Sequence, residues 1–165
     1  MSYKVTKDGA SKSKTRLTEE ANARFQTFED LEIYQSARDF RKAMYAVARR
    51  LPDFEKYGLS SQIRRAALSL TNNIAEGHGR FHYPDQIRFV LHSRGSLDEL
   101  GDDLNACLYE NYFSREEVTK LKEQARGVMI LINGYLRYLR TRCSSVREPE
   151  GSYSKTRDLL DSLPL

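Results

Sequence analysis

The chain has 165 residues, a formal net charge of +4 and 39% hydrophobic residues, which fits one domain with its own core rather than two. Its two cysteines, Cys107 and Cys143, are too few for a disulfide framework, and neither belongs to a CxxC or CxxH pair of the kind found in metal sites. The polar first residues lack the apolar core of a signal peptide, and no segment reaches the roughly 20 apolar residues that span a bilayer, so we expect a cytoplasmic protein without membrane contact.

Both ends of the chain are polar and are predicted to be disordered. Residues 1–25 hold more basic than acidic side chains and few apolar ones, which is typical of a flexible basic arm. Residues 144–165 mix Ser, Glu, Gly and Pro before a short apolar patch, which indicates a flexible tail that docks only weakly. The segment between them, residues 26–143, is the predicted folded domain.

Within this segment, apolar residues recur at spacings of three and four, which is the pattern of amphipathic helices. The first run covers residues 33–51 and stops at Pro52, which has no backbone N–H donor and does not fit inside a helix. The second run begins near Leu59 and reaches Gly77 and Gly79, the residue type expected where a helix ends in left-handed geometry.

Two further runs complete the domain. The third helix is predicted to open at Pro84, since proline is favoured in the first turn, and a turn follows at residues 111–113. Ser114 and Glu117 form a capping box, which starts a fourth helix that runs to Leu139. Short connections favour antiparallel neighbours and no segment alternates as a strand would. The sequence therefore predicts an all-α, antiparallel up-down-up-down four-helix bundle.

Three motifs of this chain occur in the same order and at matching separations in one protein family. They are YGLSSQIRRA at residues 57–66, NIAEG at residues 73–77 and GSLDEL at residues 95–100. The likeness extends to FEDL at residues 28–31 and to Ala37. Over roughly residues 28–142, the chain resembles the family named for the 23S rRNA intervening sequence, whose members are four-helix bundle proteins.

The resemblance implies a ring-like homopentamer of antiparallel four-helix subunits and a link to nucleic acid. A related branch is the accessory protein of diversity-generating retroelements, a basic pentamer that works with a reverse transcriptase and RNA. This chain departs from the family pattern at Tyr34, where tryptophan is common, and at Thr71, where a proline often follows the apolar pair of the second helix. Neither change upsets the fold, and family membership does not itself supply a biochemical activity.

Candidate nucleic-acid or interface residues lie on the second helix and just after it. Arg64 and Arg65 are adjacent and Arg80 follows the helix, so their guanidinium groups could bind phosphates or a neighbouring subunit's carboxylates bidentately. Solvated or internally paired arginines are an equally weighted alternative, and for Arg64 or Arg65 an ion pair is slightly favoured over RNA. His82 lies in a loop that mixes cations with aromatics, which suits nucleic acid, although packing of the aromatics onto the bundle end is the commoner explanation.

Four polar or small residues inside the helices predict structural roles. Asn73 and Glu76 flank the core-facing stripe of the second helix, which predicts a polar network that pairs Glu76 with an arginine and fixes helix register. A ligand site at Glu76 is the less favoured alternative. Gly95 lies in the middle of the third helix, where glycine costs about 1 kcal/mol relative to alanine. With Ser96 it predicts close packing against another helix, either of this chain or of a neighbouring subunit.

Catalytic and metal-binding signatures are missing from the sequence. His78 and His82 are four residues apart, but Gly79 and Pro84 break the helix that would place both imidazoles on one face, so we predict no metal site. The chain contains no GxSxG, GxxxxGKS/T, HExxH or GxGxxG motif. We therefore predict a non-enzymatic protein without a cofactor, and an enzyme with its site at Glu76 is the weakest of three hypotheses.

The leading hypothesis is a homo-oligomer, a pentamer according to the resemblance, that associates with RNA or DNA through its basic arm and exposed arginines. A pI of about 9.1 is compatible with this partner without demanding it. The alternative is a protein-interaction adaptor, for example an accessory subunit of a reverse transcriptase. The fourth helix favours an oligomer because its apolar residues extend beyond one stripe. The additional residues are Met129, Ile130, Leu131, Leu136 and Tyr138.

Overall fold

A computed structural model describes residues 27–145, which form four long helices and two short 3-10 helices. In chain order these are η1 (Phe28–Asp30), α2 (Glu32–Arg50), η2 (Asp53–Tyr57), α3 (Leu59–His78), α4 (Tyr83–Tyr109) and α5 (Arg115–Ser145). The predicted basic arm and most of the predicted tail lie outside the described residues, and α5 continues past the predicted domain boundary at residue 143. No helix in residues 27–145 is both long enough and apolar enough to cross a bilayer.

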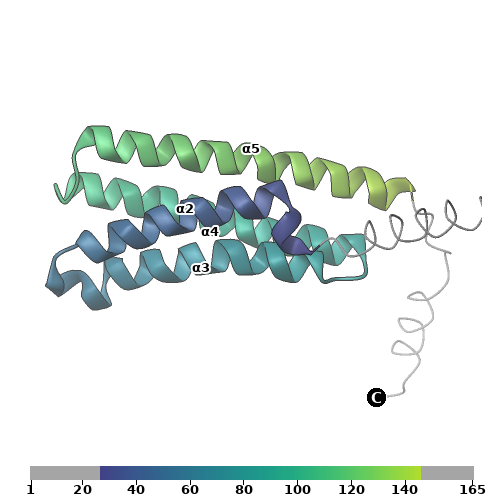
Figure 1. Ribbon diagram of the computed structural model, residues 1–165, viewed down its shortest axis with the longest axis horizontal. Coiled ribbons are helices and arrows are strands. Elements are labelled where there is room, and N and C mark those ends of the chain that lie inside the picture. Colours follow the sequence, from purple (N-terminus) through teal and green to yellow (C-terminus); the bar gives the residue numbers. More distant parts are fainter. Residues whose placement is uncertain (1–26, 146–165) are drawn as a thin grey trace, which may run out of the picture.

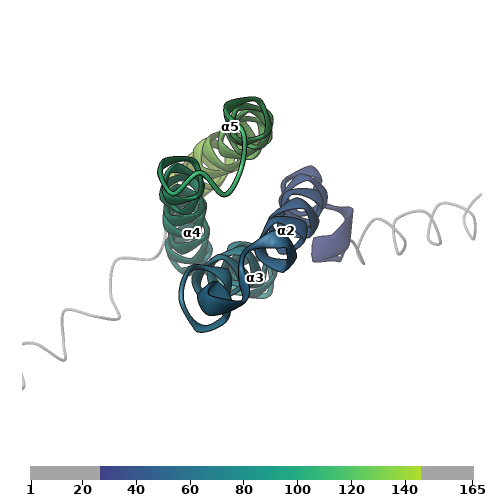
Figure 2. The ribbon, with the colours of Figure 1, turned by 90° about the vertical axis from the view of Figure 1, so that its left-hand side faces the viewer.

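The four long helices run alternately up and down along a common axis (Figure 1). In the end view, α2 and α3 form one side of the bundle and α4 and α5 form the other (Figure 2). Each helix packs against the one that precedes it, and the contact between α3 and α4 is the most extensive. The predicted all-α, antiparallel four-helix bundle is confirmed.

The core is built from the apolar stripes that the spacing of three and four predicts. Each long helix contributes to a single cluster of buried side chains. The largest apolar side chains with under 2% exposure are Met44, Ile63, Leu70, Ile74, Leu100, Leu104, Ile132 and Leu139. Leu136 also belongs to this core, with 2% exposure, because it continues the stripe of Ile132 and Leu139. Its predicted place on an extra apolar face of the fourth helix is therefore wrong.

The helix ends confirm three of the four local predictions. Helix α2 ends at Arg50, two residues before Pro52, and Pro84 lies in the first turn of α4. The left-handed end predicted for the next helix is wrong, because Gly77 lies inside α3 and Gly79 caps it with a right-handed φ of −74°. Gly77 is instead required by the close packing of α3 against α4.

The turn between α4 and α5 carries the left-handed residue of the described chain. Asn111 has a φ of 58°, a conformation that asparagine adopts more readily than most residues. After the turn, the Glu117 backbone N–H donates to Ser114 Oγ and the Ser114 N–H donates to Glu117 Oε2, each at 3.3 Å. The predicted capping box therefore starts α5.

Helices α3 and α4 approach each other closely along a seam of small residues. A Cβ atom added to Gly77 would lie 3.1 Å from Phe89 Cβ and 3.3 Å from the Gln86 carbonyl oxygen. Further along the seam, Ser93 is fully buried and its hydroxyl donates to the Leu70 carbonyl at 2.8 Å. The short side chains let the two backbones meet while the buried hydroxyl keeps a hydrogen-bond partner.

Candidate nucleic-acid interface

A basic groove lies on the surface where α2, η2 and α3 meet. It consists of two adjoining hollows of about 360 and 390 Å³ that share Tyr45, Lys56 and Arg64. Arg49 of α2 lines the first hollow and Arg65 of α3 lines the second. We call this surface the α2–α3 groove.

Local hydrogen bonds hold the elements that form the groove. The buried Ser60 hydroxyl donates to the Ala48 carbonyl at 2.9 Å, which ties the start of α3 to the end of α2. Glu55 Oε2 accepts from the Leu59 backbone N–H at 2.9 Å, at the start of α3, while Glu55 Oε1 accepts from the Tyr112 hydroxyl at 2.9 Å. Both oxygens of this carboxylate therefore have structural partners.

The charge of the groove is strongly biased towards cations. Arg49, Lys56, Arg64 and Arg65 are all exposed, and among residues 27–145 Asp53 is the acidic residue in the lining. None of the four cations lies within 4.0 Å of a carboxylate oxygen in residues 27–145. Because like charges repel one another, an anion bound among these side chains would relieve the repulsion. The groove is therefore suited to an anionic ligand.

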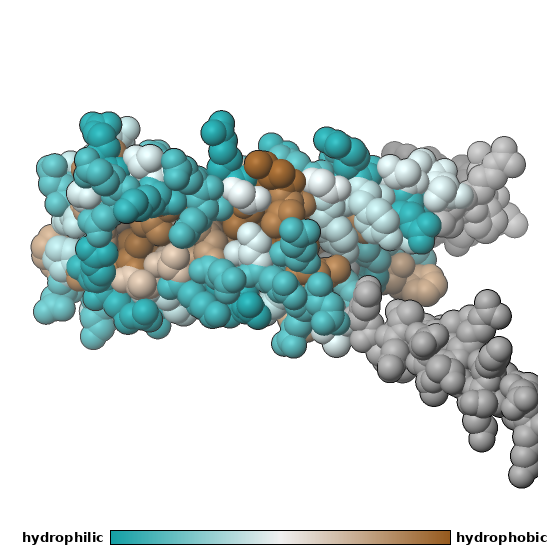
Figure 3. All heavy atoms as spheres, turned by 45° about the horizontal axis from the view of Figure 1, so that its top comes forward, coloured by the Kyte–Doolittle hydropathy of each residue, from teal (hydrophilic) through white to brown (hydrophobic). Residues whose placement is uncertain are grey.

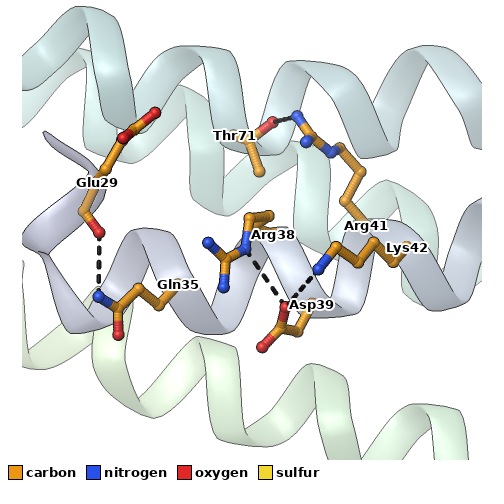
Figure 4. Close-up of polar contacts among 7 residues, drawn as sticks. All are labelled: Glu29, Gln35, Arg38, Asp39, Arg41, Lys42 and Thr71. Carbon is orange, nitrogen blue, oxygen red and sulfur yellow. Dashed lines mark hydrogen bonds and ion pairs between the residues drawn. The ribbon is translucent and has the colours of Figure 1, made fainter.

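Cations in the middle of α2 are engaged within the protein instead (Figure 4). Arg41 Nη1 donates to Thr71 Oγ1 of α3 at 2.8 Å. Arg38 and Lys42 both contact the Asp39 carboxylate, at 3.4 and 3.3 Å. These cations therefore have partners within residues 27–145, whereas the cations of the groove have no such partner there.

Tyrosine side chains lie among the cations of the groove. Tyr45 lines both hollows, and Tyr57 of η2, which is 87% exposed, lines the second. The Lys56 Nζ atom lies 5.4 Å from the centroid of the Tyr57 ring. Exposed rings among cations are typical of surfaces on which nucleobases stack while phosphates bind alongside.

The structure brings two of the four predicted nucleic-acid or interface residues together. Arg64 and Arg65 both line the α2–α3 groove. Arg80 lies beyond the other end of α3, about 24 Å along the helix axis, where its guanidinium carbon is 4.7 Å from the centroid of the Phe89 ring. His82 is the exposed residue that precedes α4 at that same end. Neither Arg80 nor His82 belongs to the groove.

Asn73 takes part in a polar network that Glu76 does not share. The Asn73 side-chain amide donates to the Ser69 carbonyl at 2.8 Å and to Ser69 Oγ at 3.0 Å. Ser96 Oγ lies 2.8 Å from Ser69 Oγ, so the network links α3 to α4. The predicted pairing of Glu76 with an arginine is confirmed, because Glu76 pairs with Arg80 one turn further on. Its expected place beside the core is wrong, because both side chains of this pair are about half exposed.

Gly95 and Ser96 point to different sides of α4. Ser96 is 8% exposed and faces α3, as close packing requires. Gly95 is exposed, and a Cβ atom added there would meet no atom within 4 Å. Close packing at Gly95 within the subunit is therefore excluded, and packing against a neighbouring subunit stays a prediction. Within the subunit, Gly77 has that role.

The described residues offer no metal cluster and no reactive buried thiol. In residues 27–145, no three His, Cys, Asp or Glu side chains gather in a way that could hold a metal ion. Cys107 is fully buried, and this burial, with a smaller effect of Asp103, raises the pKa of its thiol to about 11. The thiol therefore stays protonated at neutral pH, when a nucleophile would need the thiolate.

Sequence reasoning missed the groove residues that α2 and η2 contribute. Arg49 lies just before Pro52, and Lys56 and Tyr57 lie just after it. In an antiparallel helical hairpin, the end of one helix lies beside the start of the next. Basic and aromatic residues on both sides of the turn at Pro52 were therefore the available signal.

Comparison with known proteins places this fold in a family. The family model for the 23S rRNA-intervening sequence protein matches residues 29–134. Among solved structures, the chain is similar to a protein of unknown function from the S23 ribosomal protein family of Bacteroides thetaiotaomicron. The two are 18% identical, with a TM-score of 0.60, over 64% of this chain and 95% of that chain. This likeness concerns the fold alone.

A search of the curated proteins finds no match. The family model nevertheless covers more than half of the chain, including every long helix in whole or in part. The protein belongs to the 23S rRNA-intervening sequence protein family.

Proposed function

We propose that the protein is a non-enzymatic homo-oligomer that binds RNA or DNA through the α2–α3 groove. The observation that carries this proposal is the set of four exposed cations, Arg49, Lys56, Arg64 and Arg65, that share one groove and have no ion-pair partner in residues 27–145. Arginine forks bind phosphates bidentately, and Tyr57 offers a ring for a stacked base. The family name refers to 23S rRNA and that of the structural neighbour to a ribosomal protein, which favours RNA.

The binding should depend steeply on salt. Each phosphate that a cation neutralises releases counterions, so the logarithm of the binding constant falls with the logarithm of the salt concentration. The slope is about −0.7 per contact for a single strand and about −0.9 for a duplex. Loss of three contacts therefore lowers the magnitude of the slope by about 2 to 3.

Fluorescence anisotropy with labelled RNA and DNA, across about 50 to 200 mM salt, tests the proposal. We expect the Lys56→Gln/Arg64→Gln/Arg65→Gln variant to bind at least tenfold more weakly and with the shallower slope. Arg38→Gln/Lys42→Gln/Arg80→Gln is the matched control, because it removes the same charge from side chains that are paired within the protein. Salt-insensitive binding, or an equal loss in the control, would overturn the proposal.

The outer face of α5 supports the oligomeric part of the proposal. Ile130 and Tyr138 are 65% and 53% exposed, and Gly127 and Gly134 are exposed on the same face at spacings of three and four. Figure 3 turns the α5 side of the bundle towards the viewer and shows apolar residues gathered between hydrophilic ones. An exposed apolar strip with small residues suits contact with another helix.

Light scattering tests this part separately. The full chain should have a mass several times that of the 19.1 kDa monomer at micromolar concentration. Ile130→Lys should shift the protein towards the monomer, because a charge would then be buried in the contact. Gln124→Lys, at an exposed polar position of the same helix, is the control. A monomeric full chain would contradict the oligomer.

A protein-interaction adaptor is the second candidate function. Phe54 and Tyr57 favour it, since two large aromatic side chains exposed on one short element also suit a protein partner. A pulldown with the full chain distinguishes the two functions. Recovery of one defined protein after nuclease treatment would favour the adaptor, and this recovery should fall in a Phe54→Ala/Tyr57→Ala variant.

A further inference from the structure

A second basic groove lies between α4 and α5, on the other side of the bundle. It is a hollow of about 460 Å³, and we call it the α4–α5 groove. Its polar lining consists of Arg94 from α4 and Asn133, Arg137, Arg140, Thr141 and Ser144 from α5. Among residues 27–145, no acidic residue lines it.

The three arginines of this groove have no partner in residues 27–145. Arg94, Arg137 and Arg140 are exposed, and no hydrogen bond, ion pair or ring contact engages their guanidinium groups in that part of the chain. The negative end of the α5 dipole stabilises cations within the last turn, and all three lie outside that turn. The helices of residues 27–145 therefore gather three positive charges and supply no carboxylate that pairs with them.

We propose that the α4–α5 groove is a second phosphate-binding site. Each planar guanidinium group can donate two parallel hydrogen bonds to the oxygens of a phosphate group. Three such groups line this one hollow. The ligand is a phosphate group that is carried by a nucleic-acid strand or by a free nucleotide or phosphate. This site is separate from the α2–α3 groove and uses none of its residues.

The two grooves lie towards opposite ends of the bundle. The α2–α3 groove is at the end where α2 turns into α3, whereas the α4–α5 groove is near the C-terminal end of α5 (Figure 1). Figure 2 shows that the two helix pairs form different sides of the bundle. Helix α4, with 27 residues, is about 40 Å long. A strand bound in both grooves must therefore run along and around the bundle.

Binding of a labelled single-stranded RNA that is long enough to span the bundle tests the nucleic-acid source. In the Arg94→Gln/Arg137→Gln/Arg140→Gln variant of the full chain, affinity should fall about tenfold and the salt slope by about 2. Arg38→Gln/Lys42→Gln/Arg80→Gln is again the control for net charge. The two groove variants are measured separately, so a loss confined to one of them shows which groove has failed. If the triple variant unfolds by circular dichroism, Arg94→Gln alone is used, with a proportionally smaller loss.

A titration with inorganic pyrophosphate tests the free-phosphate source. NMR spectra of the arginine Nε–Hε groups should show shifts for Arg94, Arg137 and Arg140 that saturate, with smaller shifts for Arg38. Saturation without an effect of the variant on RNA binding supports the site and assigns it to small phosphate compounds. An effect on RNA binding without saturation assigns it to nucleic acid. Wild-type RNA affinity in the variant, together with no saturable shift, would overturn the proposal.

Discussion

The two faces of helix α4 differ in how closely they are packed, so small residues have a different role on each face. On the face towards α3, the backbones meet at Gly77, and Ser93 and Ser96 direct their hydroxyls into hydrogen bonds with α3. On the outward face, Gly95 has open space where a side chain would be. The same is true of Gly127 and Gly134 on α5. A glycine inside a helix therefore indicates close packing only where its surroundings require it, and substitutions at the two faces should separate these roles.

The largest effect is expected at the seam between α3 and α4. In Gly77→Val, the new side chain would overlap Phe89 and the Gln86 carbonyl and push the helices apart, so the free energy of unfolding should fall by about 3 kcal/mol. Urea denaturation followed by circular dichroism measures this loss. Gly95→Val introduces the same side chain in open space and should change the free energy of unfolding by less than about 1 kcal/mol. Equal losses in the two variants would contradict the distinction between the faces.

Asp103 is the exception to the well-satisfied interior of the bundle. It is 7% exposed, and its Oδ2 atom is buried without a hydrogen-bond partner in the described chain. Burial, and secondarily the charges of Glu99 and Asp102, raises the pKa of this carboxyl to about 6. The folded protein therefore holds this proton more tightly than the unfolded chain, whose carboxyl has a pKa near 3.8.

This raised pKa predicts that the Asp103 carboxyl lowers stability as pH rises. Its full favourable contribution is present below about pH 4 and is lost progressively as pH rises to about 6, because over this range the unfolded chain has released the proton that the folded protein still holds. Asp103→Asn should raise the free energy of unfolding at about pH 8 by about 2 kcal/mol and flatten its pH dependence between about 4 and 6. Asp98→Asn, at an exposed position of the same helix, is the control for both effects.

The fold could be predicted because its causes are local and periodic. Spacings of three and four place Ala37, Ile63 and Leu100 on buried stripes, and Pro52 and the Ser114 capping box set helix ends without reference to the rest of the chain. The same spacing does not determine whether a residue at the edge of a stripe points into the core or into solvent. Glu76 and Leu136 were both placed on the wrong side, because a small rotation of the helix decides which edge is buried.

The candidate grooves depend on contacts that no local pattern contains. Arg64 and Arg65 could be singled out as neighbours in sequence, but Arg49 joins them only because α2 turns back onto α3. Arg94 and Arg137 are more than forty positions apart and share a groove because α5 returns along α4. Arg80, by contrast, is close to Arg64 in sequence yet lies at the other end of α3, where Glu76 already pairs with it.

A smaller effect of opposite sign is expected on the outward face of α4. Gly95→Ala should raise the free energy of unfolding by about 0.5–1 kcal/mol, since alanine favours a helix over glycine and its methyl group meets open space. The measurement also bears on the oligomer. If a neighbouring subunit packs against Gly95, the methyl group would obstruct that contact. The mass from light scattering would then fall towards the 19.1 kDa monomer while the stabilisation is lost.

The smallest effect is expected for the ion pair between Glu76 and Arg80. Both side chains are about half exposed, and exposed pairs contribute about 0.3–0.5 kcal/mol because water and salt screen them. Glu76→Gln should therefore lower the free energy of unfolding by less than about 0.5 kcal/mol, as measured in urea at low and high salt. Asn73→Ala, which removes the hydrogen bonds to Ser69 at the seam, should cost about 1 kcal/mol. A larger loss at Glu76 than at Asn73 would contradict the placement of the structural network on the seam rather than on the surface of α3.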